Sequence, residues 1–367
     1  MITDVVILAG GFGERLWPAS SPENPKQFMT LSGGRSFLQS SVFRALSLDV
    51  SGKILIVTRK DLLDSCVKQC KEMVSGVNEK FGAKILTDVC VLAEPTPRHT
   101  AAAVMSAALF LEKSQPDVKH TVLVLTSDHV IEPVSAFALD CQKAAECAEK
   151  GNLVCFAIPP TEASTGYGYI KSGENLGDGV FKIAQFKEKP DAKTAAEYLS
   201  SALYSWNSGM FAFTTQFLLS EMQKCTPEVS AAFKIVSEGE IPEERREGQI
   251  GVSVIERWRE LEAAYSSTPP VAIDTALAEK TENACAVRAT FSWTDVGSWD
   301  VFSSLSSSVC PHTAEVEASG NFVYSDIPVA LCGVDDLIVV IKNGSALVMK
   351  KGSSALSRKV VEKMKDA

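Results

Sequence analysis

Histidine is scarce in this chain, and its cysteines do not fall into short paired motifs. Four of the 367 residues are histidines, and the ten cysteines include no Cys-x-x-Cys pair. Structural zinc sites need clusters of such residues, so the sequence argues against one. Scattered cysteines are instead typical of free thiols in a reducing, cytoplasmic compartment.

An excess of basic residues and long apolar runs are also missing. Lysine and arginine number 36 against 45 acidic residues, which gives a net charge of −9. Proteins that bind nucleic acids or membrane surfaces need a basic face. No segment approaches the length of a membrane-spanning helix, and the first residues lack the basic region of a signal peptide. We therefore expect no nucleic-acid partner, no membrane association and a cytoplasmic location.

A glycine-rich segment follows the first apolar run. Residues 5–8 are typical of a buried strand, and residues 10–13 contain three glycines. Glycines let backbone N–H groups close around phosphate oxygens. Arg15, and Lys26 eleven residues after it, can neutralise a polyphosphate chain. This pattern predicts nucleotide phosphate binding after the first strand, although a simple tight turn would also explain the glycines alone.

Two well-known glycine loops do not fit this segment. Leu16 stands where the dinucleotide-binding fingerprint has its third glycine, which disfavours an NAD-dependent dehydrogenase. No Gly-Lys-Ser or Gly-Lys-Thr sequence occurs, so the P-loop is excluded as well.

Strand-like and helix-like segments alternate over the first 155 residues or so. Such alternation predicts a parallel sheet covered on both faces, with ligands at the carboxyl ends of the strands. The further expected strands are 53–57, 89–92, 121–125 and 153–157, and the clearest helical patterns are 101–111 and 137–148.

The pattern changes after residue 160. Residues 167–170 and 181–186 predict antiparallel strands, residues 191–200, 215–238 and 251–264 predict helices, and residues 284–291 predict another strand. The serine-rich run 303–308 predicts a linker. We accordingly expect a catalytic domain over 1–302 and a small β-rich domain over 309–367. The latter contains short strands (322–324, 329–331, 337–341 and 346–349) and a basic helix (357–365). These strands are too short to bury a core alone, which predicts a role in assembly as a homodimer.

Seven motifs extend the glycine-rich segment into a family resemblance. Together with Leu8 to Phe28, they resemble the sugar-1-phosphate nucleotidylyltransferases, in the form carried by mannose-1-phosphate guanylyltransferases. The resemblance covers the chain to about residue 300 and then weakens. The motifs are EPTPRHTA (94–101), SDH (127–129), TGYGYI (165–170), FKEKP (186–190), WNSGMF (206–211), IDTA (273–276) and WTDVGSW (293–299).

The resemblance implies a fold, a reaction and a metal ion. The fold would be α/β, a Rossmann-like (GT-A-like) three-layer sandwich with a mixed, mostly parallel central sheet and a small C-terminal β unit, short and β-helix-like. The reaction would transfer GMP from GTP to mannose 1-phosphate and release pyrophosphate, with Mg²⁺ held by Asp128 and Asp295. An isolated aspartate is more often a helix cap or turn residue. Two carboxylates without histidine or cysteine nevertheless suit Mg²⁺.

The resemblance also assigns roles to individual residues. Arg15 and Lys26 would contact the phosphates of the nucleotide, and Lys189 the sugar 1-phosphate. The implied catalytic residues are Arg15, Lys26, Asp128 and Asp295; the nucleotide-binding residues are Leu8, Ala9, Gly10, Gly11, Gly13, Arg15, Glu94, Pro97, Arg98, Thr100, Ser127 and Asp128; and the sugar-phosphate-binding residues are Gly168, Glu188, Lys189 and Asn207.

Two departures from the family pattern keep alternatives open. His99 stands where the family usually has asparagine, and Lys187 replaces the usual aliphatic residue. Another sugar 1-phosphate, such as a heptose or glucose phosphate, is one alternative, because epimer specificity depends on the placement of a few hydrogen bonds. A non-catalytic subunit that binds a nucleotide-sugar is the other, although such a sensor would not need the two metal-binding aspartates.

Overall fold

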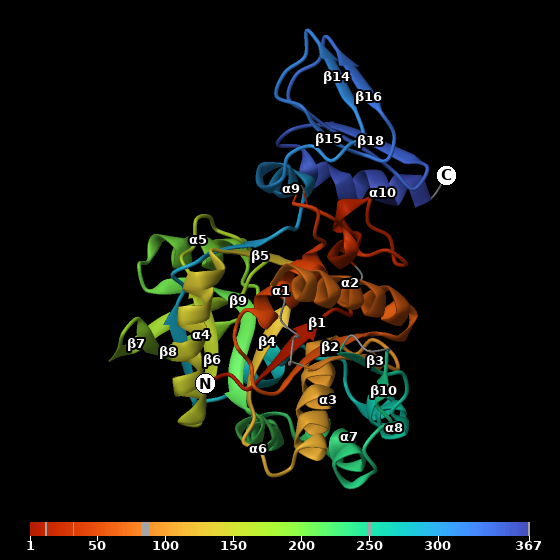
Figure 1. Ribbon diagram of the computed structural model, residues 1–367. Helices are drawn as coiled ribbons and strands as arrows, with labels where there is room; N and C mark the ends of the chain where they lie inside the picture. Colours follow the sequence, from red (N-terminus) through yellow and green to blue (C-terminus); the bar gives the residue numbers. More distant parts are fainter. Residues whose placement is uncertain (12, 32, 82–87, 248–250, 366–367) are drawn as a thin grey trace. The chain divides into compact units, whose positions relative to one another are not determined.

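The computed structural model describes residues 1–11, 13–31, 33–81, 88–247 and 251–365 (Figure 1). Packing separates the chain into two compact units. The first unit comprises Met1–Gly10, Ser41–Thr126 and Ile131–Trp293, and the second comprises Gly11–Ser40, Ser127–Val130 and Thr294–Ala367. Within the described ranges, no helix is both long enough and apolar enough to cross a bilayer.

An eleven-stranded sheet forms the centre of the first unit. Its strands follow the order β10-β11-β3-β2-β1-β4-β9-β6-β12-β8-β7. Their bounds are β1 Asp4–Leu8, β2 Lys53–Arg59, β3 Asp88–Glu94, β4 Thr121–Thr126, β6 Leu153–Ile158, β7 Tyr169–Gly177, β8 Val180–Lys187, β9 Tyr204–Thr214, β10 Arg245–Arg246, β11 Val252–Ile255 and β12 Ala284–Arg288. Every residue of β2 is buried, as expected for a strand covered on both faces.

The sheet is mixed rather than mostly parallel. Strands β11, β3, β2, β1 and β4 are parallel to one another, and so are β6 and β12. Strand β9 runs antiparallel to β4, β6 and β7, and β8 runs antiparallel to β7 and β12. The expectation of a mostly parallel sheet holds for the strands β11, β3, β2, β1 and β4 only. Antiparallel β9 lies between this group and the parallel pair β6 and β12.

Helices cover both faces of this sheet (Figure 1). The helices are α1 Phe37–Leu46, α2 Leu63–Phe81, α3 His99–Ser114, α4 Val134–Glu149, α5 Ala192–Ser200, α6 Thr215–Cys225, α7 Pro227–Glu238 and α8 Arg259–Ser267. Side chains of α3, α6, α7 and α8 share one apolar core with strand residues such as Leu55 and Val57. Helix α4 places Phe137 against Phe156 of β6, with ring centroids 6.2 Å apart. Successive side chains of a strand point to opposite faces of the sheet, so Phe156 lies outside the core that contains its neighbours Cys155 and Ala157.

Most expected elements of the first unit are confirmed, and two differ. The helix expected over 215–238 is two helices, because Pro227 begins a new one after Thr226. The helix expected over 251–264 is wrong in its first part, where β11 pairs with β3. All four residues of β11 are buried, and a run of four apolar residues is too short to distinguish a buried strand from part of a helix.

Five short strands and the helices α9 and α10 lie in the C-terminal part of the second unit. Their bounds are β14 Thr313–Val316, β15 Phe322–Ser325, β16 Val329–Cys332, β17 Leu337–Lys342, β18 Ser345–Lys350, α9 Trp299–Leu305 and α10 Ser357–Lys365. Strand β14 is parallel to β16, β15 is parallel to β17, and β17 and β18 form an antiparallel hairpin. A separate two-stranded sheet consists of β5 His129–Glu132 and β13 Ser292–Asp295. The serine-rich run is only partly a linker, since α9 includes its first residues.

Aromatic side chains form the core of the second unit. Trp299 lies 5.2 Å from Phe302 and 5.5 Å from Tyr324, measured between ring centroids. Leu16 and Phe37, from the N-terminal part of the chain, are buried in the same cluster. The C-terminal strands therefore share their core with N-terminal residues, so the packing units do not divide at residues 302–309. The assembly role of residues 309–367 remains a prediction.

Candidate active site

A buried lysine joins two of the predicted aspartates in the second unit. Lys26 lies in a short 3-10 turn, Lys26–Phe28, and its side chain is only 5% exposed. Its ammonium nitrogen donates to Asp128 Oδ2 and to Asp295 Oδ1, each at 3.0 Å. Strand β4 ends at Thr126, and Asp128 lies two residues further along the chain. Asp295 is the last residue of β13. The fold thus brings together three predicted residues that are widely separated in sequence.

The surroundings of Lys26 and Asp128 favour the charged form of each. Burial alone would lower the pKa of Lys26, but the attraction of Asp128 and Asp295 raises it. Burial likewise opposes ionisation of Asp128, but the charges of Lys26 and His129 and the hydrogen bond from Lys26 lower its pKa to about 2. One ammonium and two carboxylates sum to a formal charge of −1, which favours a further cation, although the Arg15 guanidinium also lies 4.0 Å from Asp295.

Three residues of the glycine-rich segment contact either the turn that carries Lys26 or the aspartate Asp295. Gly13 has a φ of +56°, and a Cβ atom there would stand 2.5 Å from the backbone nitrogen of Lys26. Only glycine fits both requirements. Arg15 is largely exposed, and its Nη1 lies 4.0 Å from Asp295 Oδ2. Gly11 accepts a hydrogen bond from the Gln27 side chain at 3.3 Å. The glycine-rich segment therefore packs against the turn that carries Lys26 and leaves the Arg15 side chain exposed to solvent.

Asp128 and Asp295 fit the requirements of a magnesium site. Lys26 contacts one oxygen of each carboxylate, and the two side chains remain 34% and 21% exposed. Over the described residues, no three His, Cys, Asp or Glu side chains converge as a closed metal site would require. Mg²⁺ does not need such a cage, since it commonly takes one or two carboxylates and completes its shell with water and substrate phosphates.

Residues predicted to bind the nucleotide surround a buried glutamate in the first unit. Glu94 ends β3 and accepts a hydrogen bond from the Tyr265 hydroxyl at 3.0 Å. A Cβ atom on Gly10 would stand 2.6 Å from Glu94 Oε1, so the glycine allows the carboxyl group to approach the backbone. Burial raises the pKa of Glu94 to about 7, although the Tyr265 hydrogen bond and the charge of Arg59 oppose the shift. Glu94 is therefore partly protonated near neutral pH.

Several other residues predicted to bind the nucleotide form hydrogen bonds within the protein. Arg98 donates to the backbone oxygen of Tyr265 at 2.8 Å, and Thr100 accepts from the backbone of Ile273 at 2.9 Å. The backbone of Ala9 bonds to Val57, and its oxygen accepts from Thr58. Leu8 ends β1, Pro97 precedes α3, and Ser127 is buried. Glu94 is the one carboxylic side chain among the first-unit residues of this set, and its pKa is raised by burial.

His99 adopts a left-handed backbone conformation at the start of α3. Its φ is +60°, in the left-handed region. Asparagine, aspartate and histidine enter this region more readily than other non-glycine residues. The replacement of the family's usual asparagine by His99 is therefore compatible with an unchanged backbone at the start of α3.

The predicted sugar-phosphate residues form a second group in the first unit. The backbone nitrogen of Asn207, on β9, donates to the backbone oxygen of Gly168 at 2.8 Å. Lys189 donates to Glu188 Oε1 at 2.7 Å, and a Cβ atom on Gly168 would stand 2.6 Å from Glu188 Oε2. Lys189 has a φ of +42°, which is unusual for a long side chain. All four residues thus lie close together.

One residue of this group was not assigned a role from the sequence. Asp274 accepts a hydrogen bond from the Asn207 side chain at 2.9 Å. Burial and the negative charge of Glu188 raise its pKa to about 6. The only signal in the sequence was its place in the motif over residues 273–276, which carried no assigned role.

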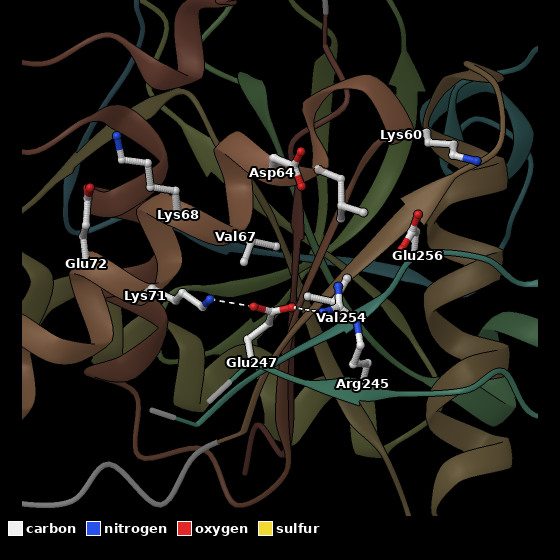
Figure 2. Close-up of a pocket in the computed structure, with 11 residues that line it drawn as sticks. Lys60, Asp64, Val67, Lys68, Lys71, Glu72, Arg245, Glu247, Val254 and Glu256 are labelled. Atoms are coloured by element: carbon white, nitrogen blue, oxygen red, sulfur yellow. Dashed lines mark hydrogen bonds and ion pairs between the residues drawn. The ribbon is translucent and has the colours of Figure 1, made fainter. Parts of the chain in front are cut away.

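A cavity in the first unit is lined by other residues (Figure 2). It has a volume of about 500 Å³ and lies along α2 and strands β10 and β11. Glu247 receives ion pairs from Lys71 and Arg245, each at 2.6 Å. None of the predicted site residues lines it, so it is not the candidate active site.

Comparison with known proteins points in the same direction as the motifs. Residues 4–310 match the nucleotidyl transferase family. The mannose-1-phosphate guanylyltransferase RfbM of Salmonella typhimurium is 33% identical over 369 residues, covering 98% of this chain and 72% of that protein. The mannose-1-phosphate guanylyltransferase of Escherichia coli K12 is 33% identical over 375 residues, covering 98% and 73%. A solved structure described as a mannose-1-phosphate geranyltransferase, from Thermus thermophilus, is 27% identical, with a TM-score of 0.78 and full coverage of both chains.

Proposed function

This chain belongs to the nucleotidyl transferase family, and from that premise we propose that it transfers GMP from GTP to mannose 1-phosphate, giving GDP-mannose and pyrophosphate. The pair of carboxylates held by Lys26 is the observation that carries the proposal. A protein that only sensed a nucleotide-sugar would have no use for this charged cluster. The guanylyltransferase relatives support the choice of GTP and mannose 1-phosphate.

The proposed reaction is a single displacement. A phosphate oxygen of mannose 1-phosphate attacks the α-phosphorus of GTP, and the bond from that phosphorus to the bridging oxygen breaks. The electron pair leaves with pyrophosphate. Because the nucleophile is already an anion, no general base is needed, and the protein contributes alignment and charge neutralisation.

Charged residues near the glycine-rich segment and the two aspartates would act in this step. Arg15 is exposed and would neutralise the departing pyrophosphate. Lys26 uses two of its three N–H donors on Asp128 and Asp295, which leaves the third for an oxygen of the α-phosphate. Asp128 and Asp295 would hold Mg²⁺, which supplies further charge neutralisation when bound.

Other residues would recognise the nucleotide and the sugar 1-phosphate. Glu94, Arg98 and Thr100 are assigned to the nucleotide with the Gly10 backbone. Glu188 and Asn207 would accept hydrogen bonds from sugar hydroxyls, and Lys189 would pair with the 1-phosphate. The short distances within each group support these assignments.

Pyrophosphate release provides the direct test. We expect release with GTP and mannose 1-phosphate in the presence of Mg²⁺, and none in excess EDTA. A matrix of nucleoside triphosphates and sugar 1-phosphates, followed by a coupled pyrophosphate assay, measures both specificities. Turnover with another sugar 1-phosphate would replace the mannose assignment, and no turnover with any pair would overturn the proposed reaction.

Lys189→Ala is expected to weaken the sugar phosphate far more than GTP. Loss of a charge-assisted contact should raise the KM for mannose 1-phosphate about ten- to a hundredfold. Steady-state kinetics with each substrate varied in turn separates the two constants. Glu188→Gln is the matched comparison, since it keeps an acceptor oxygen and should alter sugar selectivity instead. A raised KM for GTP alone would mean that the two phosphate assignments are exchanged.

The proposal also includes an oligomeric state and a cellular location. The strands over residues 309–367 would support a homodimer, which light scattering of the purified chain can measure. The enzyme would act in the cytoplasm, a reducing compartment that suits its free cysteines. Neither statement affects the displacement chemistry.

A further inference from the structure

Asp274 has no role in the proposed reaction, although it stands in one of the recurring motifs. It is the first residue of a π-helical turn, Asp274–Ala278. Such turns are rare and are found often at functional sites. Its carboxylate contacts the group that includes Glu188 and Asn207.

The hydrogen bonds of Asn207 leave one atom unsatisfied. Its backbone nitrogen bonds to Gly168, and its side-chain Nδ2 donates to Asp274 Oδ1 at 2.9 Å. Its side-chain oxygen is buried and accepts no hydrogen bond from the described residues. A buried acceptor without a partner is costly and is therefore a place where a ligand donor is expected.

We infer that Asp274 is a positioning residue, which holds the Asn207 amide so that its oxygen accepts a hydrogen bond from a sugar hydroxyl. This inference rests on the proposed function. An ionised carboxylate can only accept hydrogen bonds, so it fixes which end of the amide faces it. The opposite orientation would set the amide oxygen against a carboxylate oxygen.

The surroundings of Asp274 make this orientation sensitive to pH. Burial and the charge of Glu188 raise its pKa to about 6, while its own backbone N–H, Lys189 and Asn207 oppose the shift. Among the described residues, Cys155 on β6 also interacts with Asp274, and Glu279, which pairs with Lys187, donates its backbone N–H to the Asp274 carbonyl at 2.9 Å. Below about pH 6, the protonated carboxyl becomes a donor and can pair with the Asn207 oxygen. Sugar binding should then weaken.

A pair of reciprocal substitutions tests the inference. Asp274→Asn gives residue 274 an amide that can donate to the Asn207 oxygen and so turn it away from the sugar. Asn207→Asp alone sets two carboxylates against each other. The double variant restores the hydrogen bond with donor and acceptor exchanged, and it leaves an acceptor oxygen at position 207 for the sugar.

The expected readout is a change in one Michaelis constant. Asp274→Asn should raise the KM for mannose 1-phosphate about tenfold, which corresponds to one lost hydrogen bond, and should change the KM for GTP by less than about twofold. Asn207→Asp should be worse, and the double variant should recover most of the loss. Calorimetric titration with mannose 1-phosphate measures the same loss without turnover. Asp117→Asn, at an exposed position before β4, is the matched control.

The pH profile gives a second readout that a merely structural role would not move. The ratio of variant to wild-type KM cancels the titration of the sugar phosphate itself, whose second pKa is also near 6. This ratio should fall toward one as pH drops through about 6. An unchanged KM in Asp274→Asn, or a double variant no better than Asn207→Asp, would overturn the inference while the proposed function stands. If wild type neither binds nor converts any sugar 1-phosphate, both fail.

Discussion

Replacing either Asp128 or Asp295 by asparagine is expected to lower turnover by roughly 10²–10³-fold, as loss of a central electrostatic group does in other enzymes. Asparagine keeps the shape and can still accept from Lys26, so the fold should survive. It removes the charge that a metal ion needs, however, and leaves the cluster without its excess negative charge. The turnover number at saturating substrates and the melting temperature together measure the two effects.

The metal requirement distinguishes a ligand from a structural residue. If the aspartates hold Mg²⁺, part of the lost rate should return at raised Mg²⁺ concentrations. Asp117→Asn should show no such dependence, since Asp117 is exposed in the loop between α3 and β4. Near-normal rates for either variant at ordinary Mg²⁺ would show that the residue is structural.

Lys26→Met is expected to reduce both activity and stability. It leaves two carboxylates facing each other without their shared ammonium group. Breaking a fully buried ion pair costs about 3–5 kcal/mol, and the partial exposure of both aspartates should reduce this to about 2–3 kcal/mol. Activity should fall at least about a hundredfold, because the phosphate donor is also lost.

Added Mg²⁺ gives this prediction a sharper readout. The ion would relieve the repulsion between the two carboxylates, so it should raise the melting temperature of Lys26→Met more than that of wild type. Lys234→Met, at an exposed position on α7, is the control and should behave as wild type does. An equal Mg²⁺ response in all three proteins would contradict a shared site.

The parallel half of the sheet could be predicted because its strands are unbroken apolar runs. Strand β2 is buried along its whole length, and its pattern has no competing interpretation. Strand β9 was harder, since it carries polar residues at its centre. Gly209 has a φ of +72°, and the register between β6 and β9 shifts at this part of the strand. Strand prediction depends on the alternation of apolar and polar residues. Polar side chains that face a site and irregular hydrogen bonding between neighbouring strands both disturb this alternation.

The candidate site was predictable as a set of residues but not as a set of contacts. Asp128 and Asp295 were selected through motifs, because nothing in a sequence shows that residues so far apart meet. Lys26 was expected on the phosphates, and the structure shows it bonded to both aspartates. Tyr265, which bonds to Glu94, stands outside every motif. Its role depends on α8 packing against α3 and α7, which only the folded chain specifies.

The interrupted second unit also has a consequence for synthesis on the ribosome. Its first segment ends at Ser40, and its last begins only at Thr294. At 5–20 residues per second, translation leaves roughly 13–50 s between these points. During that interval Leu16 and Phe37 lack the aromatic partners that later bury them. The nascent chain therefore presents an unfinished apolar surface to chaperones until its last fifth has been made. The sheet of the other unit is also incomplete for most of that time, because β12, which lies between β6 and β8, ends at Arg288.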